Sequence, residues 1–256
     1  MNAVNARIAS VREGRRARIT LQAGALNVLG IADIRALTAA IRENEGCSVV
    51  TIEAAGERAF CAGVEVGDHV PEKAPEMLAA FEEMASAFLS ASPAIVCAAN
   101  APAMGGGFEL LLLADIALCS TRAFFSLPEV QLAALPPIAC ALLPRAIGTQ
   151  RAFNAILTGR KIDAQSALAW GLVSEVVAPE ELSTATEALC ERLLSYSAVA
   201  LRACKRAIRL DDLSLAMRAY RDDLLPSRDG AEGIAAFLEK RSPVWAHTLP
   251  TGDDYR

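Results

Sequence analysis

The chain has 256 residues and a mass of 27.0 kDa, with 53% hydrophobic and 21% charged residues. This composition is typical of a folded globular protein and excludes an intrinsically disordered chain. The net charge of −5 and the scattered Lys and Arg residues argue against a nucleic-acid partner.

Strands and helices alternate over the first half of the chain. Patterns of period two and buried apolar runs predict strands within residues 6–22 (two around a turn), 47–54, 93–100 and 115–120. Helical spacing predicts helices at 32–44, at 76–89 and from about 106. This alternation predicts crossover connections and a mainly parallel sheet.

From about residue 139 the pattern becomes helical, and only 172–177 looks extended. The predicted helices lie at 139–148, 150–159, 164–171, 179–197, 198–210 and 230–240. We therefore divide the chain into an α/β core at 1–195 and a helical region at 196–256. The apolar surface of these helices suggests packing on another subunit.

The cysteines and the N-terminus indicate the compartment. Seven cysteines stand singly, without zinc-site spacing, so we expect reduced and mostly buried thiols. The N-terminus has a basic pair but no apolar run behind it, which argues against a secretory signal. Asp115 interrupts the longest apolar run well short of the roughly 20 residues that span a bilayer. We expect a cytoplasmic protein with no membrane partner.

The stretch 103–115, AMGGGFELLLLAD, combines three glycines before a helix with a glutamate among leucines. A helix N-terminus offers unpaired N–H groups, and glycine lets a substrate atom approach them. If the helix begins near Gly106, Glu109 falls one turn later, next to the oxygen that this amide would hold. Close packing and an exposed helix face are the structural alternatives for these residues.

Two further stretches add functional groups of the same kinds. The loop at 57–69 places Val64 after a glycine between small residues, where its N–H is suited to be a second donor. Glu129 follows Pro128, which restricts the local backbone. The sequence thus offers two amide donors and two carboxylates.

Seven segments together resemble the crotonase family, also called the enoyl-CoA hydratase/isomerase superfamily. They are LNVL, AFCAGVEV, MGGGFEL, LPEV, LPRAIG, ILTGRKIDAQSALAWGLVSEVV and EGIAAFLEKR, in this order. The resemblance implies a ββα spiral core with a helical C-terminal trimerisation region. It also implies that the amides of Val64 and Gly106 form an oxyanion hole for the carbonyl of a CoA thioester.

Family hydratases hold and activate water with two glutamates, which the resemblance places at Glu109 and Glu129. We prefer Glu109 as the base on water and Glu129 as the proton donor, although the sequence leaves the two roles open. Retention of both glutamates favours hydration of a conjugated double bond over isomerisation. The lyase is expected to need no metal or redox cofactor, because CoA arrives with the substrate.

Within the family, AGVEVGDHVPEK and PEVQLAALPPIA look most like the cyclohexa-1,5-diene-1-carbonyl-CoA hydratases. Glu65 departs mildly from the aspartate usual in their loops. Pro137 departs more strongly from ordinary hydratases, which have a glycine there whose amide can lie near the water. Because proline has no N–H, we expect a pocket reshaped for a ring.

The resemblance also implies contacts to CoA and to the acyl group. Arg58 and Ala62 are expected near CoA, and Phe237 and Lys240 are expected to reach the CoA of a neighbouring subunit in a homotrimer or homohexamer. A solvated helix charge is the alternative for Lys240. We place His69, Phe108 and Pro137 in the substrate pocket, with a surface role as the alternative for His69.

Other functions remain as alternatives or are excluded. The runner-up is a general short-chain enoyl-CoA hydratase or isomerase, and a non-catalytic acyl-CoA-binding or RNA-associated relative belongs to a different class. A nicotinamide dehydrogenase is disfavoured because no G-x-G-x-x-G follows the first strand. Two histidines leave little for a catalytic triad or a metal site. Asp115 is expected to be a structural partner at a helix-strand junction, and Cys61 to be packed.

Overall fold

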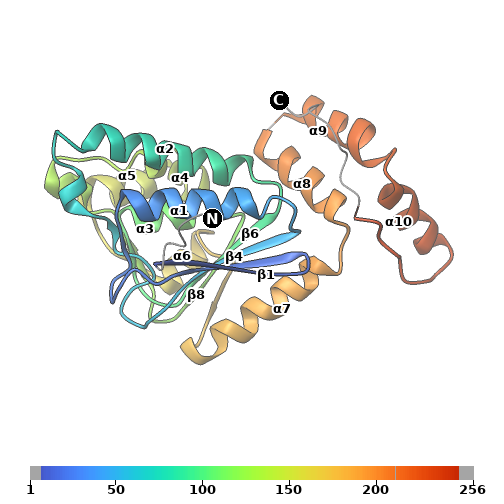
Figure 1. Ribbon diagram of the computed structural model, residues 1–256, viewed down its shortest axis with the longest axis horizontal. Helices are drawn as coiled ribbons and strands as arrows, with labels where there is room; N and C mark the ends of the chain where they lie inside the picture. Colours follow the sequence, from blue (N-terminus) through green and yellow to red (C-terminus); the bar gives the residue numbers. More distant parts are fainter. Residues whose placement is uncertain (1–6, 211, 248–256) are drawn as a thin grey trace.

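The computed structural model describes residues 7–210 and 212–247, which form a six-stranded sheet with helices on both faces and a helical C-terminal part (Figure 1). The strand order is β1-β2-β4-β6-β8-β11. The strands are β1 (Ile8–Glu13), β2 (Arg16–Leu21), β4 (Val49–Ala54), β6 (Ala94–Ala99), β8 (Ile116–Ser120) and β11 (Glu175–Val177). Only the β1–β2 pair is antiparallel, so the predicted mainly parallel sheet is confirmed.

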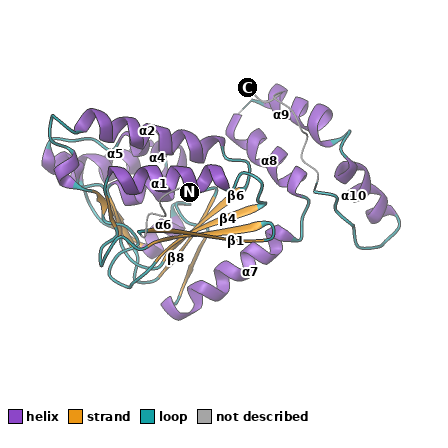
Figure 2. Ribbon diagram, viewed as in Figure 1, coloured by secondary structure: helices purple, strands orange, loops and turns teal. Residues whose placement is uncertain are grey.

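The two faces of this sheet are covered by different helices, α1 (Ile31–Glu43) and α2 (Ala74–Ser90) on one side and α7 (Leu182–Leu194) on the other (Figure 2). Neighbouring residues of one strand serve opposite faces, because side chains alternate along a strand. Val50 belongs to the main core, whereas Val49 packs in a smaller cluster with Leu182 and Leu193 of α7. The interfaces on both faces of the sheet are apolar, which explains the continuous apolar runs of the central strands.

Short strands outside the main sheet position the loops that matter for function. One small sheet has the order β10-β9-β7, and the other pairs β3 with β5 in parallel. They comprise β3 (Val28–Leu29), β5 (Gly63–Val64), β7 (Ala103–Met104), β9 (Phe124–Ser126) and β10 (Ile162–Asp163). We did not predict these two- and three-residue strands, and β10 corrects our expectation that only 172–177 is extended after residue 139. Such strands are too short to show periodicity, and distant partners define them.

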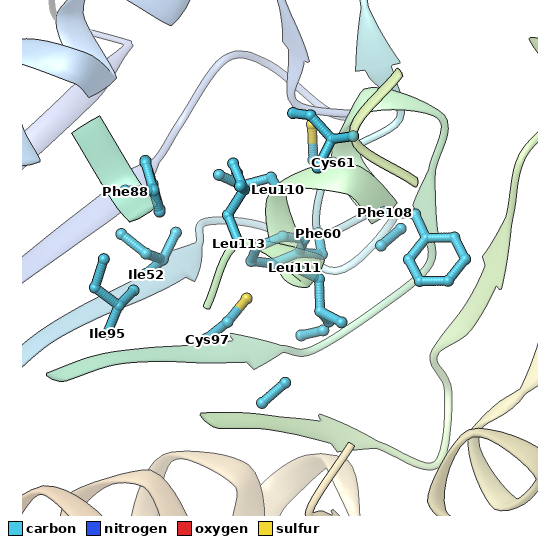
Figure 3. Close-up of a cluster of buried hydrophobic side chains, with 14 of the residues drawn as sticks. Ile52, Phe60, Cys61, Phe88, Ile95, Cys97, Phe108, Leu110, Leu111 and Leu113 are labelled. Carbon is cyan, nitrogen blue, oxygen red and sulfur yellow. The ribbon is translucent and has the colours of Figure 1, made fainter. Parts of the chain in front are cut away.

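Helix α3 (Gly106–Leu112) leaves β7 and enters the centre of the core, as the glycine stretch predicted. Its Leu110 and Leu111, and Leu113 just after it, belong to a buried cluster with Phe60 and Cys97 (Figure 3). This packing surrounds a helix of only two turns with apolar side chains. The cluster fixes the position of its N-terminus.

The remaining helices follow the predicted pattern up to α8. They are α4 (Pro137–Ile147), α5 (Thr149–Thr158), α6 (Ala164–Ala169), α8 (Ala198–Leu210), α9 (Leu213–Arg218) and α10 (Arg228–Leu238), with a π-helical turn at Ala219–Leu224. We did not predict α9 or this turn. In Figure 1, α8, α9 and α10 project from the end of the molecule opposite to α3 and α5.

Asp115 joins the core to the helical part, as expected of a junction residue. Its carboxylate pairs with Lys205 at 2.7 Å and with Arg209 at 2.6 Å, both on α8. It also accepts a hydrogen bond from the Ile95 amide at 2.7 Å. The boundary that we drew at 195/196 falls between α7 and α8, and the independence of the two parts stays a prediction.

All seven cysteines are free thiols, and five of them are buried, as predicted; Cys140 and Cys204 are exposed. Burial raises the pKa of the Cys61 thiol to about 12, so this residue is a packed side chain and not a nucleophile. Among the helices in the described ranges, none combines the length and the apolarity that crossing a membrane requires.

Candidate active site

Two backbone amides meet where the N-terminus of α3 lies against β5. Gly106 is the first residue of α3, so its N–H has no carbonyl one turn earlier in the helix. The Glu65 amide donates to Leu29 O at 2.9 Å, so in a parallel ladder the preceding amide, that of Val64, faces away from β3. A Cβ atom on Gly106 would lie 3.5 Å from the Val64 nitrogen. The two amides are therefore neighbours.

Each glycine of the triplet is required by a different contact. Gly105 has φ 53°, and a Cβ there would lie 2.9 Å from Glu129 Oε1. A Cβ on Gly106 would lie 2.9 Å from Val64 Cγ2, and one on Gly107 only 2.1 Å from the Cys61 carbonyl oxygen. Distances below 3.0 Å exclude a side chain unless the neighbour moves. The triplet thus keeps the backbone bare where the amides and a carboxylate converge.

Glu109 lies one turn into α3 and is 2% exposed. Its Oε1 accepts hydrogen bonds from the Ile138 amide at 2.7 Å and the Ala139 amide at 3.0 Å. These amides belong to the first turn of α4, whose dipole also favours a negative charge at this end. Its Oε2 has no hydrogen-bond partner within the described ranges. One carboxylate oxygen is therefore anchored, and the other is available.

Glu129 begins the 3-10 helix η2 (Glu129–Leu132), directly after Pro128. Its Oε2 is buried and has no hydrogen-bond partner among the residues that the structure describes. A buried, unpartnered carboxylate oxygen is costly and points to a ligand or water that completes it. The contact between Glu129 Oε1 and the Cβ position of Gly105 places this carboxylate beside the start of α3.

The pKa values of both glutamates are raised, and the charge of Glu129 contributes to the shift at Glu109. Burial raises the pKa of Glu109 to about 7, and the negative charge of Glu129 raises it further, while the amides of Ala139 and Ile138 oppose the shift. Burial also raises the pKa of Glu129, and the nearby charge of His69 opposes this. Both shifts favour the protonated form of the carboxyl group over the charged one. Such a pair is suited to acid-base work near neutral pH.

The structure brings together five of the predicted site residues: Val64, Gly106, Glu109, Glu129 and Pro137, the last being the first residue of α4. His69 follows the 3-10 helix η1 (Val66–Asp68) and lies near enough to Glu129 to affect its pKa. Its Nδ1 is 3.0 Å from Glu65 O.

Phe108, which we expected in the substrate pocket, is buried in the core of the chain, and its contact with the substrate stays a prediction. Its side chain is 0% exposed, and its ring centroid lies 5.4 Å from that of Phe125. Figure 3 shows it among the buried side chains of the core. Residues 108 and 109 point in different directions from α3, so Glu109 faces α4 while Phe108 fills the interior.

The residues expected to contact CoA are spread over the molecule. Ala62 directly precedes β5, and its amide donates to Leu26 O at 2.9 Å, while Arg58 is exposed in the loop before it. Phe237 is 82% exposed on α10, and Lys240 follows that helix. Within one chain, α10 lies far from α3 (Figure 1). These four assignments stay predictions.

Two anchoring features were not predicted from the sequence. The amides of Ile138 and Ala139 hold Glu109, and the available signal was the Pro136-Pro137 pair, because proline is favoured at the first position of a helix. Asp68 is 8% exposed and accepts from the Ile31 amide at 3.2 Å, at the N-terminus of α1. This bond ties the loop after Val64 to α1.

Comparison with known proteins decides the family. The sequence model of the family described as Enoyl-CoA hydratase/isomerase matches residues 16–248. The chain belongs to the enoyl-CoA hydratase/isomerase family. A carnitinyl-CoA dehydratase of Proteus mirabilis is 35% identical over 218 residues, 80% of this chain and 83% of that protein. A putative enoyl-CoA hydratase/isomerase of Bacillus subtilis is 33% identical over 251 residues, 92% and 96% of the two chains.

Solved structures of family members share the fold. An enoyl-CoA hydratase from Bacillus anthracis superimposes with a TM-score of 0.88 at 29% identity, covering 94% of this chain and all of that one. An enoyl-CoA hydratase/carnithine racemase from Magnetospirillum magneticum gives 0.86 at 28% identity, with 94% and 96% covered. The predicted crotonase fold is confirmed. As a family member the chain is a hydratase-type enzyme that acts on acyl-CoA thioesters.

Proposed function

We propose that the chain adds water to the conjugated double bond of an enoyl- or dienoyl-CoA thioester. The observation that carries this proposal is the convergence of the neighbouring amides of Val64 and Gly106 with the buried Glu109 and the half-buried Glu129. An oxyanion hole alone would serve many thioester reactions, because it only stabilises an enolate. Two carboxyl groups that differ in protonation add the means to activate water and to deliver a proton.

In the proposed mechanism, the thioester oxygen accepts hydrogen bonds from both amides while water attacks the β-carbon. Each such donor is worth about 3 to 4 kcal/mol of transition-state stabilisation. Glu109, anchored through Oε1, takes the proton of the water through its free Oε2. Glu129 holds a proton on its unpartnered side and delivers it to the α-carbon. The two amides that hold Glu109 support its charged form, which is consistent with the role of base.

For the acyl group we propose a cyclic dienoyl ester, cyclohexa-1,5-diene-1-carbonyl-CoA, as the favoured substrate. Support comes from Pro137, which heads α4 beside the Ile138 amide that holds Glu109. Because Pro137 offers no N–H, the water depends on the two carboxylates, and the ring of the proline takes up space at the pocket. The alternative is a linear short-chain enoyl-CoA.

We further propose that Arg58 and Ala62 contact CoA and that Phe237 and Lys240 contact the CoA of a neighbouring subunit. Support comes from the exposure of large apolar side chains on the C-terminal helices, including Phe237 and Leu238. Exposed apolar surface of this kind is typical of subunit contacts. A homotrimer or homohexamer of the 27.0 kDa chain would follow, with CoA as part of the substrate and no separate cofactor.

The test is a panel of thioesters followed by mass spectrometry. Crotonyl-CoA and cyclohexa-1,5-diene-1-carbonyl-CoA are incubated with the enzyme, and the gain of one water is measured. Carnitinyl-CoA is included for water loss, because a relative is named a carnitinyl-CoA dehydratase. A preference for the cyclic ester supports the ring proposal, and a strong preference for crotonyl-CoA or carnitinyl-CoA refutes it.

Matched variants separate catalysis from binding alone. Glu109→Gln and Glu129→Gln are each expected to lower kcat by about 10² to 10⁴. The control Glu82→Gln lies on the exposed side of α2 and should keep the wild-type rate. If the wild-type protein binds thioesters but neither adds water to any of them nor removes it, the non-catalytic alternative replaces the hydratase.

A further inference from the structure

A surface hollow of about 590 Å³ lies along α5 and beside Trp170, the residue that ends α6. Its lining includes Arg151, Phe153, Leu157 and Arg160. None of the residues that form the candidate active site lines it. Its volume is in the range of small-molecule pockets, which is roughly 300 to 1,000 Å³.

Two arginines face the indole ring of Trp170 in this hollow. The Cζ atoms of Arg151 and Arg160 lie 5.1 Å and 5.7 Å from the ring centroid. Within residues 7–210 and 212–247, neither guanidinium forms an ion pair with a carboxylate. A guanidinium stacked on an aromatic face still presents its N–H edge to a planar anion. Among the described residues, the hollow therefore carries two positive charges without an acidic partner, in a chain of net charge −5.

Helix α5 places large apolar side chains outside and small ones inside. Phe153 is 57% exposed and Leu157 is 63% exposed, whereas Ala152 and Ala155 are 1% exposed. This inverted arrangement leaves apolar surface next to the two arginines. Asn154 on the same helix side adds an amide that can donate or accept hydrogen bonds.

We propose that this hollow is a second ligand site, which binds an anion that carries a flat ring. Its carboxylate or phosphate lies between Arg151 and Arg160, and its ring packs against Phe153 and Leu157. The arginines select an anion because no acidic side chain in the described part of the chain pairs with them. The apolar surface selects a ring, because a bare anion would leave Phe153 and Leu157 in water.

The test uses Trp170 as a reporter in the full-length protein. The chain has two tryptophans, so Trp245→Phe leaves Trp170 as the only one. This protein is titrated with AMP, benzoate and inorganic phosphate while indole fluorescence is recorded. A saturable change with AMP or benzoate, at a Kd of about 1 mM or tighter, supports the site. AMP identifies a phosphate ligand, and benzoate a carboxylate.

Substitutions then tie the signal to the hollow. Arg151→Gln and Arg160→Gln should each weaken binding about tenfold, as expected for the loss of a charge-assisted hydrogen bond. The control Arg35→Gln, an exposed arginine on α1, should leave the Kd unchanged. Because the readout is fluorescence, it does not depend on hydratase activity, and Glu109→Gln should bind equally well.

Any one of four results would overturn the proposal. One is the absence of a saturable change with both ring-bearing anions. Another is that inorganic phosphate binds as tightly as AMP. A further one is that Arg35→Gln weakens ligand binding as much as Arg151→Gln and Arg160→Gln do. The last is a change of oligomeric mass in Arg151→Gln, measured by light scattering, together with no ligand binding. That result would make the hollow an interface between copies of the chain.

Discussion

Glu109 occupies a position where burial opposes its charge and two amides favour it. Burial prevails, so its pKa is raised to about 7. A base of this strength is half ionised near neutral pH, where general-base catalysis is most effective. The same shift has a cost. Because the folded state disfavours the charged form of Glu109, the protein becomes less stable when this group ionises.

The pH dependence of kcat/KM should reveal the ionisation of Glu109. With Glu109 as the base, kcat/KM is expected to rise as pH increases through about 7. In Glu129→Gln a negative charge is removed, so the ionisation of the residual activity should move to lower pH. Rates between about pH 5 and 9 measure both effects. A flat profile from about pH 6 to 8 would contradict the assignment.

The difference in stability between Glu109→Gln and the wild type should depend on pH, and its sign can be predicted. The folded-state pKa of Glu109 is raised from 4.5 to about 7. The stability that protonated Glu109 contributes to the wild type is therefore fully present below pH 4.5, and it is lost as pH rises to about 7. The loss is about 3 kcal/mol. Glutamine keeps an oxygen for the two amides but carries no charge. The variant should therefore unfold like the wild type at about pH 4 and be more stable at about pH 8.

Urea unfolding at both pH values measures this difference, with the exposed Glu82→Gln as the control. Equal free energies of unfolding for Glu109→Gln and the wild type at the higher pH would show that Glu109 does not resist ionisation.

At the scale of elements, the start of α3 combines requirements that differ from one residue to the next. Gly107 must be glycine because its Cβ would collide with the backbone at Cys61. The closest contact of a Cβ at residue 106 would be with the tip of the Val64 side chain, which can rotate. The first requirement concerns folding, and the second concerns the space in front of the two amides.

Alanine substitutions should separate these requirements. Gly107→Ala is expected to lose at least about 3 kcal/mol of stability, because a backbone carbonyl cannot move aside. Gly106→Ala should stay folded but lose about 10² to 10³ in kcat, because its methyl group occupies the oxyanion position. Circular dichroism and kcat measure the two effects. Wild-type kcat in Gly106→Ala would show that the oxyanion lies elsewhere.

At the scale of the whole molecule, one carboxylate links the sheet to the C-terminal helices. The side chain of Asp115 is 17% exposed and that of Lys205 only 10%, so their ion pair lies largely out of water. Burial lowers the pKa of Lys205, and the charge of Asp115 opposes this. Without Asp115, a largely buried ammonium group would lose its partner.

Asp115→Ala should therefore destabilise the protein by about 3 kcal/mol. The matched control is Asp222→Ala, which removes a pair with Arg221 in which both side chains are more than half exposed. Because solvent screens such a pair, its loss should destabilise the protein far less. Thermal or urea unfolding compares the two. Equal effects would mean that the Asp115 pairs do not tie α8 to the core.

The sequence by itself determined the order of long elements, the parallel sheet and the residues that would meet at the start of α3. Periodicity and glycine placement are local properties, so β4, α2 and α3 could be predicted without knowledge of their partners. Only the tertiary structure decided the short strands β3, β5 and β10, because distant segments define them. It also decided that Phe108 is buried and that the amides of α4 hold Glu109, since burial and pKa depend on residues far away in the chain.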